Sequence, residues 1–243
     1  AEAVPNEFPT TEYEASPVLP FQIQFVSDRT LRIKATSGPQ FHPEATSLML
    51  VDGVAPNHPE LWKYSKIEGG FKFTSKQGSV EIQVKPWHVK IYDAKGKLLT
   101  GTLHDTDFKN TYTPTLPFSY VRRNSDYSRS MGAAFSLEPD EKIFGCGESF
   151  TQFNKRGQKV VLWTDDANGI QNETMYKPIP FYMSSRGYGV FMHHSTPITV
   201  DFGKYYASAN EMYIGDDEAD LFFKFFMGIL REITCHSIET ATI

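Results

Sequence analysis

Residues 143–203 read IFGCGESFTQFNKRGQKVVLWTDDANGIQNETMYKPIPFYMSSRGYGVFMHHSTPITVDFG. Short runs in which apolar and polar residues alternate are separated here by turn-forming residues, and this pattern is typical of β-strands with one buried face. The alternation predicts five strands, at residues 142–146, 158–163, 181–184, 189–193 and 198–202. The stretch therefore predicts antiparallel β-structure.

The same pattern continues toward the N-terminus. Residues 21–25 and 31–35 alternate on either side of the turn Ser27-Asp28-Arg29, which indicates a β-hairpin. Further alternating runs lie at residues 71–73, 80–84, 87–91 and 131–137. No window before the C-terminal tail shows helical periodicity, so the sequence predicts an all-β fold, a large antiparallel β-sandwich of two sheets.

One internal region breaks the pattern. Residues 100–127 are rich in Thr, Pro and Asp and are predicted to form loops. Pro114 and Pro117 exclude a central strand there, because proline cannot donate a hydrogen bond to a neighbouring strand.

Composition limits the classes of protein that the chain can represent. Its 243 residues are 40% hydrophobic and 14% aromatic, which is enough to build a core. The net charge of −5 argues against nucleic acid or an anionic membrane surface as a partner. The sequence has no apolar run long enough to span a membrane and begins without Met or a signal peptide. It is compatible with the cytoplasm, or with the periplasm or secretion after removal of a leader.

Cysteine and histidine positions predict no metal site, and we expect no cofactor. Cys146 and Cys235 are far apart in sequence, and the seven histidines show no zinc-type spacing. Cys146, between two glycines after an apolar run, is predicted to be a small buried core residue. A disulfide between the two cysteines stays open as an alternative.

Three motifs carry a resemblance to a known family. They are Gly145-x-Gly147-Glu148, the segment Asn154-Lys155-Arg156-Gly157-Gln158, and Trp163-x-x-Asp166. Together they resemble the N-terminal β-domain of the family 31 glycoside hydrolases, the α-glucosidases and α-xylosidases. The resemblance is strongest over residues 143–203, looser over 21–137 and lost after 223.

The resemblance implies a galactose-mutarotase-like β-sandwich at residues 1–223, with a substrate-pocket loop at about 164–177. In the family a catalytic (β/α)8 barrel follows, and it needs roughly 200 residues or more. Only about 40 residues follow Gly203, so we expect the barrel and its catalytic aspartates to be absent from this chain. We therefore expect no catalytic residue here and an inactive isolated chain.

The resemblance also implies which residues contact sugar. The last residue of the Trp-x-x-Asp pattern lies in the family on a loop over the barrel mouth, and this position is Asp166. An ionised carboxylate can accept hydrogen bonds from two adjacent sugar hydroxyls. Asp165 and Trp163 are the further substrate-binding candidates; a solvated turn capped by the two aspartates is the alternative.

The acidic residues could also act as a catalytic pair or have a structural role. Asp165 and Asp166 are rejected as a catalytic pair, because neighbouring side chains of an extended chain point to opposite faces. Glu148 is expected to form a buried ion pair or hydrogen bonds, with Lys155 or Arg156 as candidate partners.

The C-terminal residues 224–243 form an atypical tail, which is either a truncated or frame-shifted linker to the missing barrel or a divergent terminal helix. The apolar run Leu221–Phe226 is expected to be exposed where the barrel docks and to favour a homo-oligomer.

Three functions remain open at the level of sequence. The first is the N-terminal domain of a retaining α-glycosidase that acts on an α-linked oligosaccharide or glycoside. The second is a free-standing carbohydrate-binding β-sandwich, and the third is an enzyme similar to an aldose epimerase.

Overall fold

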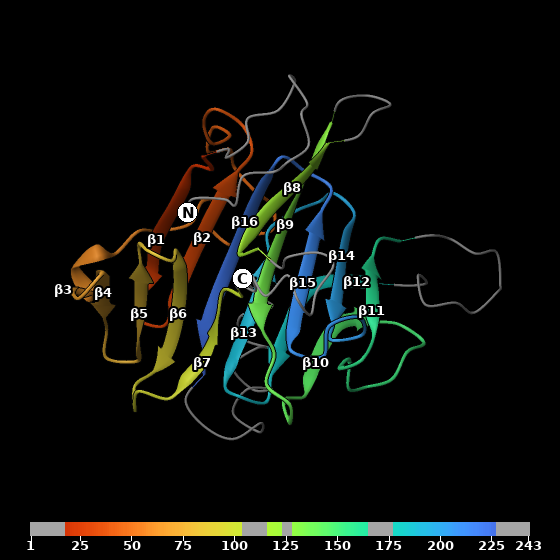
Figure 1. Ribbon diagram of the computed structural model, residues 1–243. Coiled ribbons are helices and arrows are strands. Elements are labelled where there is room, and N and C mark those ends of the chain that lie inside the picture. The colour runs from red at the N-terminus through yellow and green to blue at the C-terminus, as the bar shows by residue number, and fades with distance from the viewer. Residues whose placement is uncertain (1–17, 104–115, 123–127, 165–176, 227–243) are drawn as a thin grey trace, which may run out of the picture.

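The computed structural model describes residues 18–103, 116–122, 128–164 and 177–226. These residues form antiparallel β-structure and one short 3-10 helix, η1 (Pro59–Leu61) (Figure 1). The strands are β1 (Phe21–Ser27), β2 (Thr30–Thr36), β3 (Lys63–Ile67), β4 (Gly70–Thr74), β5 (Gly78–Gln83), β6 (His88–Asp93), β7 (Leu98–Gly101), β8 (Phe118–Arg122), β9 (Arg129–Ser136), β10 (Ile143–Glu148), β11 (Lys159–Leu162), β12 (Lys177–Ser184), β13 (Tyr188–Met192), β14 (Ile198–Phe202), β15 (Ala209–Ile214) and β16 (Glu218–Phe225).

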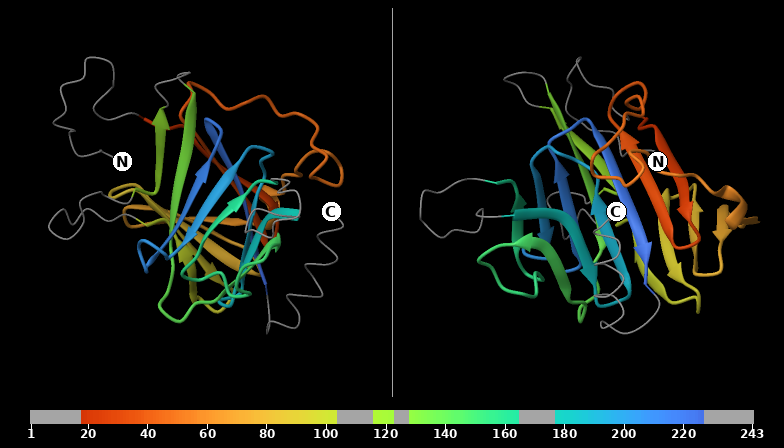
Figure 2. Two further views of the ribbon diagram at one scale, coloured as in Figure 1. Left: turned by 90° about the vertical axis from the view of Figure 1, so that its right-hand side faces the viewer. Right: turned by 180° about the vertical axis from the view of Figure 1, so that it is seen from behind.

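The strands pair into three sheets. The six-stranded sheet has the order β1-β2-β16-β13-β12-β10 and is nearest the viewer on the right of Figure 2. The first five-stranded sheet runs β3-β4-β5-β6-β7, and the second runs β11-β14-β15-β9-β8. A bridge between Thr102 and Phe135 joins the two five-stranded sheets.

Both five-stranded sheets cover the same face of the six-stranded sheet. Phe25, Leu31, Phe223, Val190 and Tyr182 are opposite one another in neighbouring strands, so their side chains share one face. From this row Phe25 contacts Phe73 of the first five-stranded sheet, Phe223 contacts Phe135 of the second, and Tyr182 contacts Phe202 of the second. The core therefore lies between two layers, as in a β-sandwich.

Strands predicted from alternation are confirmed. The hairpin β1–β2 and the five strands within residues 143–203 form with boundaries close to those predicted. The two-layer sandwich is also confirmed, with the difference that two sheets make up the second layer.

The loop prediction for residues 100–127 is wrong at residues 100–101, which end β7, and at residues 118–122. Residues 118–122 form β8, which pairs with β9 at the edge of the second five-stranded sheet. Pro117 directly precedes the strand, and proline is tolerated at the start of an edge strand because the missing N–H faces no partner.

The apolar run Leu221–Phe226 is not the exposed patch that the sequence suggested. It lies on β16, between β2 and β13 in the middle of the six-stranded sheet. Leu221, Phe223 and Phe225 point into the core and are at most 2% exposed, and Phe222 on the outer face is also buried. This run therefore offers no surface for self-association.

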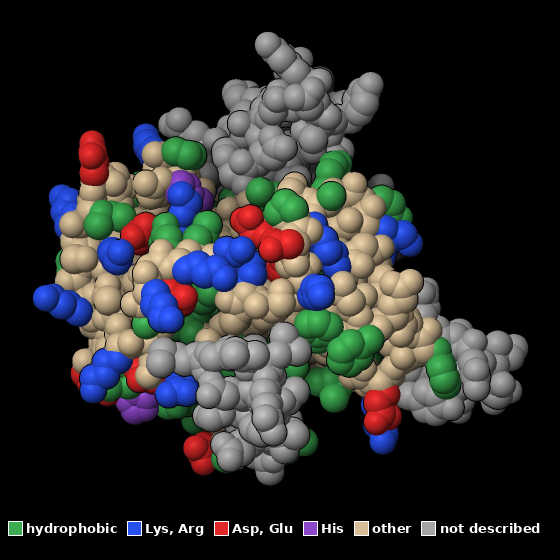
Figure 3. Space-filling model, turned by 90° about the horizontal axis from the view of Figure 1, so that it is seen from below, with side chains coloured by type: hydrophobic (Ala, Val, Ile, Leu, Met, Phe, Trp, Pro, Cys, Tyr) green, Lys and Arg blue, Asp and Glu red, His purple; other side chains and the backbone are tan. Residues whose placement is uncertain are grey.

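No helix among the described residues is long and apolar enough to span a membrane. On the face seen from below, basic side chains lie beside acidic ones (Figure 3).

Candidate functional site

A cavity of about 520 Å³ opens where β10 ends. Its walls come from the last residues of β10 and from the segment that leads to β11. The lining residues are Gly145, Gly147, Glu148, Ser149, Phe150, Thr151, Phe153 and Lys155. Its size lies within the range of small-molecule sites in proteins.

Unusual backbone geometry shapes the floor of this cavity. Gly145, Cys146 and Gly147 have φ values of 117°, 67° and 83°, and the pairing of β10 with β12 shifts register between the two glycines. A Cβ atom on Gly147 would lie 2.0 Å from the Lys177 carbonyl oxygen, so only glycine fits this close approach. Cys146 holds a positive φ without being glycine, and such strained positions are frequent at functional sites.

Lys155 is the buried charge of the cavity. The residue is 4% exposed, its backbone N–H donates to the Ile143 carbonyl, and its Nζ donates to Ser149 Oγ and Thr151 Oγ1. Among the described residues, no carboxylate lies within ion-pair distance of Nζ. Burial lowers the pKa of this ammonium group.

The expected buried ion pair of Glu148 with Lys155 or Arg156 is wrong. The Glu148 side chain is 72% exposed, and its nearest cation is Lys177, at 3.9 Å between Oε2 and Nζ. Arg156 instead donates to the carbonyl oxygens of Glu138 and Ala207. The register shift in β10 explains the difference, because a bulge redirects the residues that follow it.

Cys146 lies beneath the cavity as the predicted core residue. It is 2% exposed, and burial raises the pKa of its thiol to about 12. The thiol is therefore protonated near neutral pH and unreactive. Cys235, the alternative disulfide partner, lies outside the described residues.

Of the three sequence-predicted sugar-binding residues, the structure describes one, Trp163, and this residue is not part of the cavity wall. Trp163 follows β11 and is 49% exposed. Asp165 and Asp166 lie outside the described residues, as does most of the expected loop 164–177. Lys177, where the described chain resumes, is opposite Glu148 in the β10–β12 pairing, so the cavity borders one end of that loop. Sequence reasoning missed Phe150 and Phe153, whose exposure on the cavity wall no local pattern reveals.

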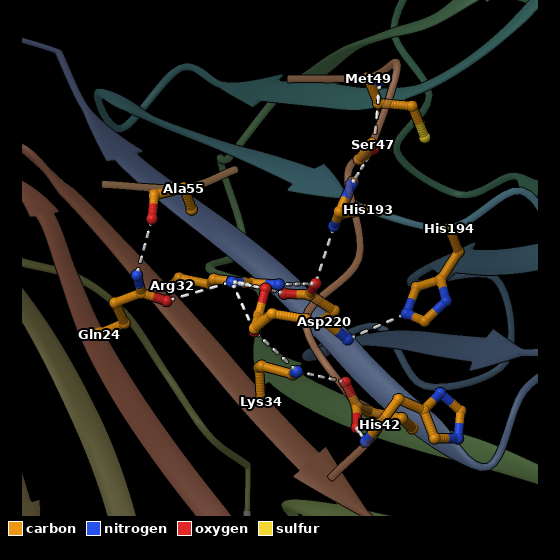
Figure 4. A network of polar contacts seen from close by, with 12 residues as sticks. Gln24, Arg32, Lys34, His42, Ser47, Met49, Ala55, His193, His194 and Asp220 are labelled. Carbon is orange, nitrogen blue, oxygen red and sulfur yellow. Dashed lines mark hydrogen bonds and ion pairs between the residues drawn. The ribbon is translucent and has the colours of Figure 1, made fainter. Parts of the chain in front are cut away.

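A second polar cluster covers the outer face of the six-stranded sheet (Figure 4). Arg32 donates from Nε and Nη2 to the two carboxylate oxygens of Asp220, at 2.8 and 2.7 Å. His193 Nδ1 lies 2.8 Å from Asp220 Oδ2, and His193 Nε2 lies 2.7 Å from Ser47 Oγ. Glu44 contacts Arg32 from outside.

The order Ser47–His193–Asp220 is that of a nucleophile-activating triad, but its electrostatics differ. In such a triad the carboxylate stabilises a developing imidazolium. Here Arg32 already neutralises both oxygens of Asp220, and Ser47 Oγ also accepts the Met49 N–H at 3.2 Å. The hydrogen bonds and ion pairs of this cluster therefore hold residues 42–56 against the six-stranded sheet.

One group among the described residues has the composition of a metal site. The ligand atoms of His42, Asp216 and Asp217 lie within 4.8 Å of one another. His42 Nε2 is 2.7 Å from Asp217, whereas Nδ1 is 3.9 Å from Asp216, so the two carboxylates face opposite ring nitrogens. This geometry fits ion pairing with the imidazole better than coordination of one ion.

Comparison with known proteins gives a family match over most of the chain. Residues 20–201 match the family model described as the glycosyl hydrolase 31 N-terminal galactose mutarotase-like domain. The α-xylosidase XylQ of Lactiplantibacillus pentosus is 41% identical over 129 residues, which are 47% of this chain and 17% of that protein. An α-xylosidase of Emericella nidulans is 45% identical over 69 residues, which are 28% of this chain and 9% of that protein. The matches thus span less than a fifth of either relative.

Solved structures share the fold. A family 31 dextranase of Flavobacterium johnsoniae in complex with isomaltotriose has a TM-score of 0.71 and 20% identity, covering 91% of this chain and 25% of that one. An α-xylosidase from a soil metagenome in complex with xylose has a TM-score of 0.68 and 19% identity. The similarity covers 85% of this chain and 30% of the α-xylosidase.

Proposed function

Because the chain belongs to the glycosyl hydrolase 31 N-terminal galactose mutarotase-like domain family, we propose that it serves as the N-terminal domain of a retaining α-glycosidase. An α-xylosidase is favoured over an α-glucosidase, since two relatives with more than 40% identity carry that name. In this role the domain supports a catalytic barrel and contributes one loop to the sugar pocket.

The chemistry expected from the family is double displacement through a covalent glycosyl–enzyme. An aspartate nucleophile and an aspartate acid/base belong to the barrel, so this chain contributes binding and positioning. Asp166, with Asp165 beside it, accepts hydrogen bonds from sugar hydroxyls, and Trp163 offers a ring face. A charge-assisted hydrogen bond of this kind contributes roughly 1.5–3 kcal/mol.

The family match over residues 20–201 carries the proposal, because it includes the β10–β11 region and all of residues 164–177. The exposure of Trp163 and the cavity at the end of β10, whose residue Glu148 is opposite Lys177, support a sugar-binding role for this region.

Replacing residues 164–177 with a short Gly-Ser turn in the full-length enzyme tests the role of the loop. We expect kcat/KM for an aryl α-xyloside to fall at least tenfold while the melting temperature stays within a few degrees. Unchanged kinetics in a folded variant would remove the loop from sugar binding.

A free-standing carbohydrate-binding domain is the second candidate. It is favoured by the exposure of Phe150 (53%) and Phe153 (80%) on the cavity wall, because aromatic rings can pack against sugar rings. Saturable binding of neutral xylo- or gluco-oligosaccharides by the chain alone would favour this function.

The epimerase alternative needs a His and a Glu that converge in a cleft. The described cavity wall supplies Glu148 without a histidine.

A further inference from the structure

Lys155 is buried and has no carboxylate partner in the part of the chain that the structure describes, and this calls for a ligand. Removing an ammonium group from water costs several kcal/mol unless a counter-charge offsets it. Nζ donates hydrogen bonds to the hydroxyls of Ser149 and Thr151, its described hydrogen-bond partners, and the residue lines the cavity above the neutral, buried Cys146 thiol. We propose that the cavity beside Lys155 binds a sugar that carries one carboxylate group, such as a hexuronate.

The donors around Nζ match the two oxygens of a carboxylate. An ammonium group has three donors, and two of them are directed at Ser149 Oγ and Thr151 Oγ1. The two hydroxyls lie 2.9 Å apart, so one donates to the other and the second keeps its proton for another acceptor. One ammonium donor and one hydroxyl donor thus remain to bind one carboxylate.

Counted over the described lining residues and Lys177, the charges at the rim cancel and leave Lys155 as the net charge of the cavity. Glu148 lines the cavity mouth, and Lys177 lies 3.9 Å from it and offsets its charge. Both side chains are more than 70% exposed, so solvent screens their effect on a bound anion. The Glu148 oxygens are acceptors and suit sugar hydroxyls.

The size and the walls of the cavity favour a sugar acid over a small inorganic anion. A volume of about 520 Å³ exceeds what a bare anion fills, and the rings of Phe150 and Phe153 provide apolar surface for the C–H face of a sugar. A carboxylated sugar uses the cation, the rings and the rim carboxylate together, whereas a bare anion uses the cation alone.

Isothermal titration calorimetry of the 243-residue chain with glucuronate tests the proposal. Glucose is the neutral probe of similar shape, and acetate supplies the carboxylate alone. We expect glucuronate to bind with a Kd at least tenfold below the values for glucose and acetate. Equal affinity for glucose, or no saturable binding of glucuronate, would overturn the proposal.

Substitutions separate the role of Lys155 from a general charge effect. Lys155→Met should weaken glucuronate binding at least tenfold, and Thr151→Val should weaken it severalfold. Lys95→Met, which removes an exposed lysine in the turn between β6 and β7, should change the Kd less than twofold. Near-ultraviolet circular dichroism verifies that each variant is folded. Glucuronate binding that survives in folded Lys155→Met refutes the assignment, and because the chain is tested alone, the outcome is independent of glycoside hydrolysis.

Discussion

At the scale of single residues, Asp220 determines how the outer face of the six-stranded sheet is held together. Arg32 donates two hydrogen bonds to its carboxylate, His193 contacts one of the same oxygens, and the backbone N–H of Asp220 donates to His194 Nε2. All of these contacts join strands that are far apart in sequence. Losing the carboxylate would leave the Arg32 guanidinium buried beside only a half-exposed Glu44.

Asp220→Ala should therefore destabilise the fold by about 3–5 kcal/mol, because removing one partner of a buried ion pair leaves an uncompensated charge. The matched control is Glu81→Ala, which removes a partly exposed partner of Lys72 and should cost about 1 kcal/mol or less. Urea unfolding of both variants measures the difference. Equal losses of unfolding free energy in the two variants would show that the Arg32–Asp220 pair contributes no more to stability than an exposed ion pair.

The sugar-contact residues make a second prediction at this scale. In the full-length enzyme, Asp166→Ala should lower kcat/KM by roughly ten- to a hundredfold, the loss of one charge-assisted contact of about 1.5–3 kcal/mol. Asp165→Ala should have a much smaller kinetic effect, because adjacent side chains of an extended chain diverge. Kinetics and melting curves of the two variants decide the matter. Equal and small kinetic effects would assign the pair to a structural turn.

At the scale of elements, the bulge in β10 requires glycine for two reasons that can be separated. Gly147→Ala combines a φ of +83° with a Cβ 2.0 Å from the Lys177 carbonyl, whereas Gly157→Ala has a φ of +78° and open space around the new methyl group. The backbone strain alone costs about 1–2 kcal/mol. We expect Gly157→Ala to lower the free energy of unfolding by this amount and Gly147→Ala to lower it clearly more. Melting temperatures measure this, and identical shifts would mean that the close approach at β10 relaxes freely.

Local alternation was sufficient to predict the strands that have one polar and one apolar face. The hairpin β1–β2 and the strands β5 and β6 follow from residues two apart that share a face. The strands β3, β7, β8 and β15 were missed. β7 and β8 have only four and five residues, and β3 has a mostly exposed, polar sequence. In β15 the buried Asn210 takes a core position, which interrupts the apolar alternation.

Alternation also misjudges the polar face of β2. Arg32 and Lys34 occupy the polar positions of that strand, which a local reading assigns to solvent, yet they are 3% and 4% exposed. Residues 42–56 and the acidic residues of β16 cover them. Such burial depends on contacts between residues almost 190 positions apart, which the sequence of one strand does not contain.

The candidate site was predictable only where a motif specified it. The Trp-x-x-Asp pattern pointed to Trp163, which is 49% exposed, whereas the role of Asp166 stays a prediction. The burial of Lys155 without a described carboxylate beside it was not predictable, because it depends on how the bulge in β10 orients Glu148.

At the scale of the whole molecule, buried ionisable groups make stability depend on pH. Burial lowers the pKa of His194 to about 4, and its Nε2 accepts a hydrogen bond that a protonated ring cannot accept. The unfolded chain, with an ordinary histidine pKa near 6.5, then binds more protons between these values. Stability from this group is complete above about pH 6.5 and falls as pH drops toward 4.

As the pH falls from 6.5 to 4, we expect protonation of His194 to lower the free energy of unfolding by up to about 3 kcal/mol. Burial opposes ionisation of Asp220, but hydrogen bonds from Arg32 and His193 outweigh it and lower its pKa to about 2. The contribution of Asp220 is therefore lost only below about pH 3.8. Urea unfolding at several pH values measures both steps. His194→Gln should flatten the upper step and the exposed His58→Gln should not; a slope unchanged in His194→Gln would contradict the assignment.

The final prediction concerns what the chain can do alone. A retaining glycosidase needs two carboxyl groups about 5–5.5 Å apart on either side of the anomeric carbon. The cavity wall among the described residues supplies one carboxylate, Glu148, and Asp165 with Asp166 are adjacent in sequence, so they cannot flank a sugar. The purified chain should therefore release no nitrophenol above background from aryl α-xyloside or α-glucoside. Turnover that co-purifies with the protein through repeated chromatography, and that Glu148→Gln abolishes, would instead place a catalytic carboxylate in this cavity.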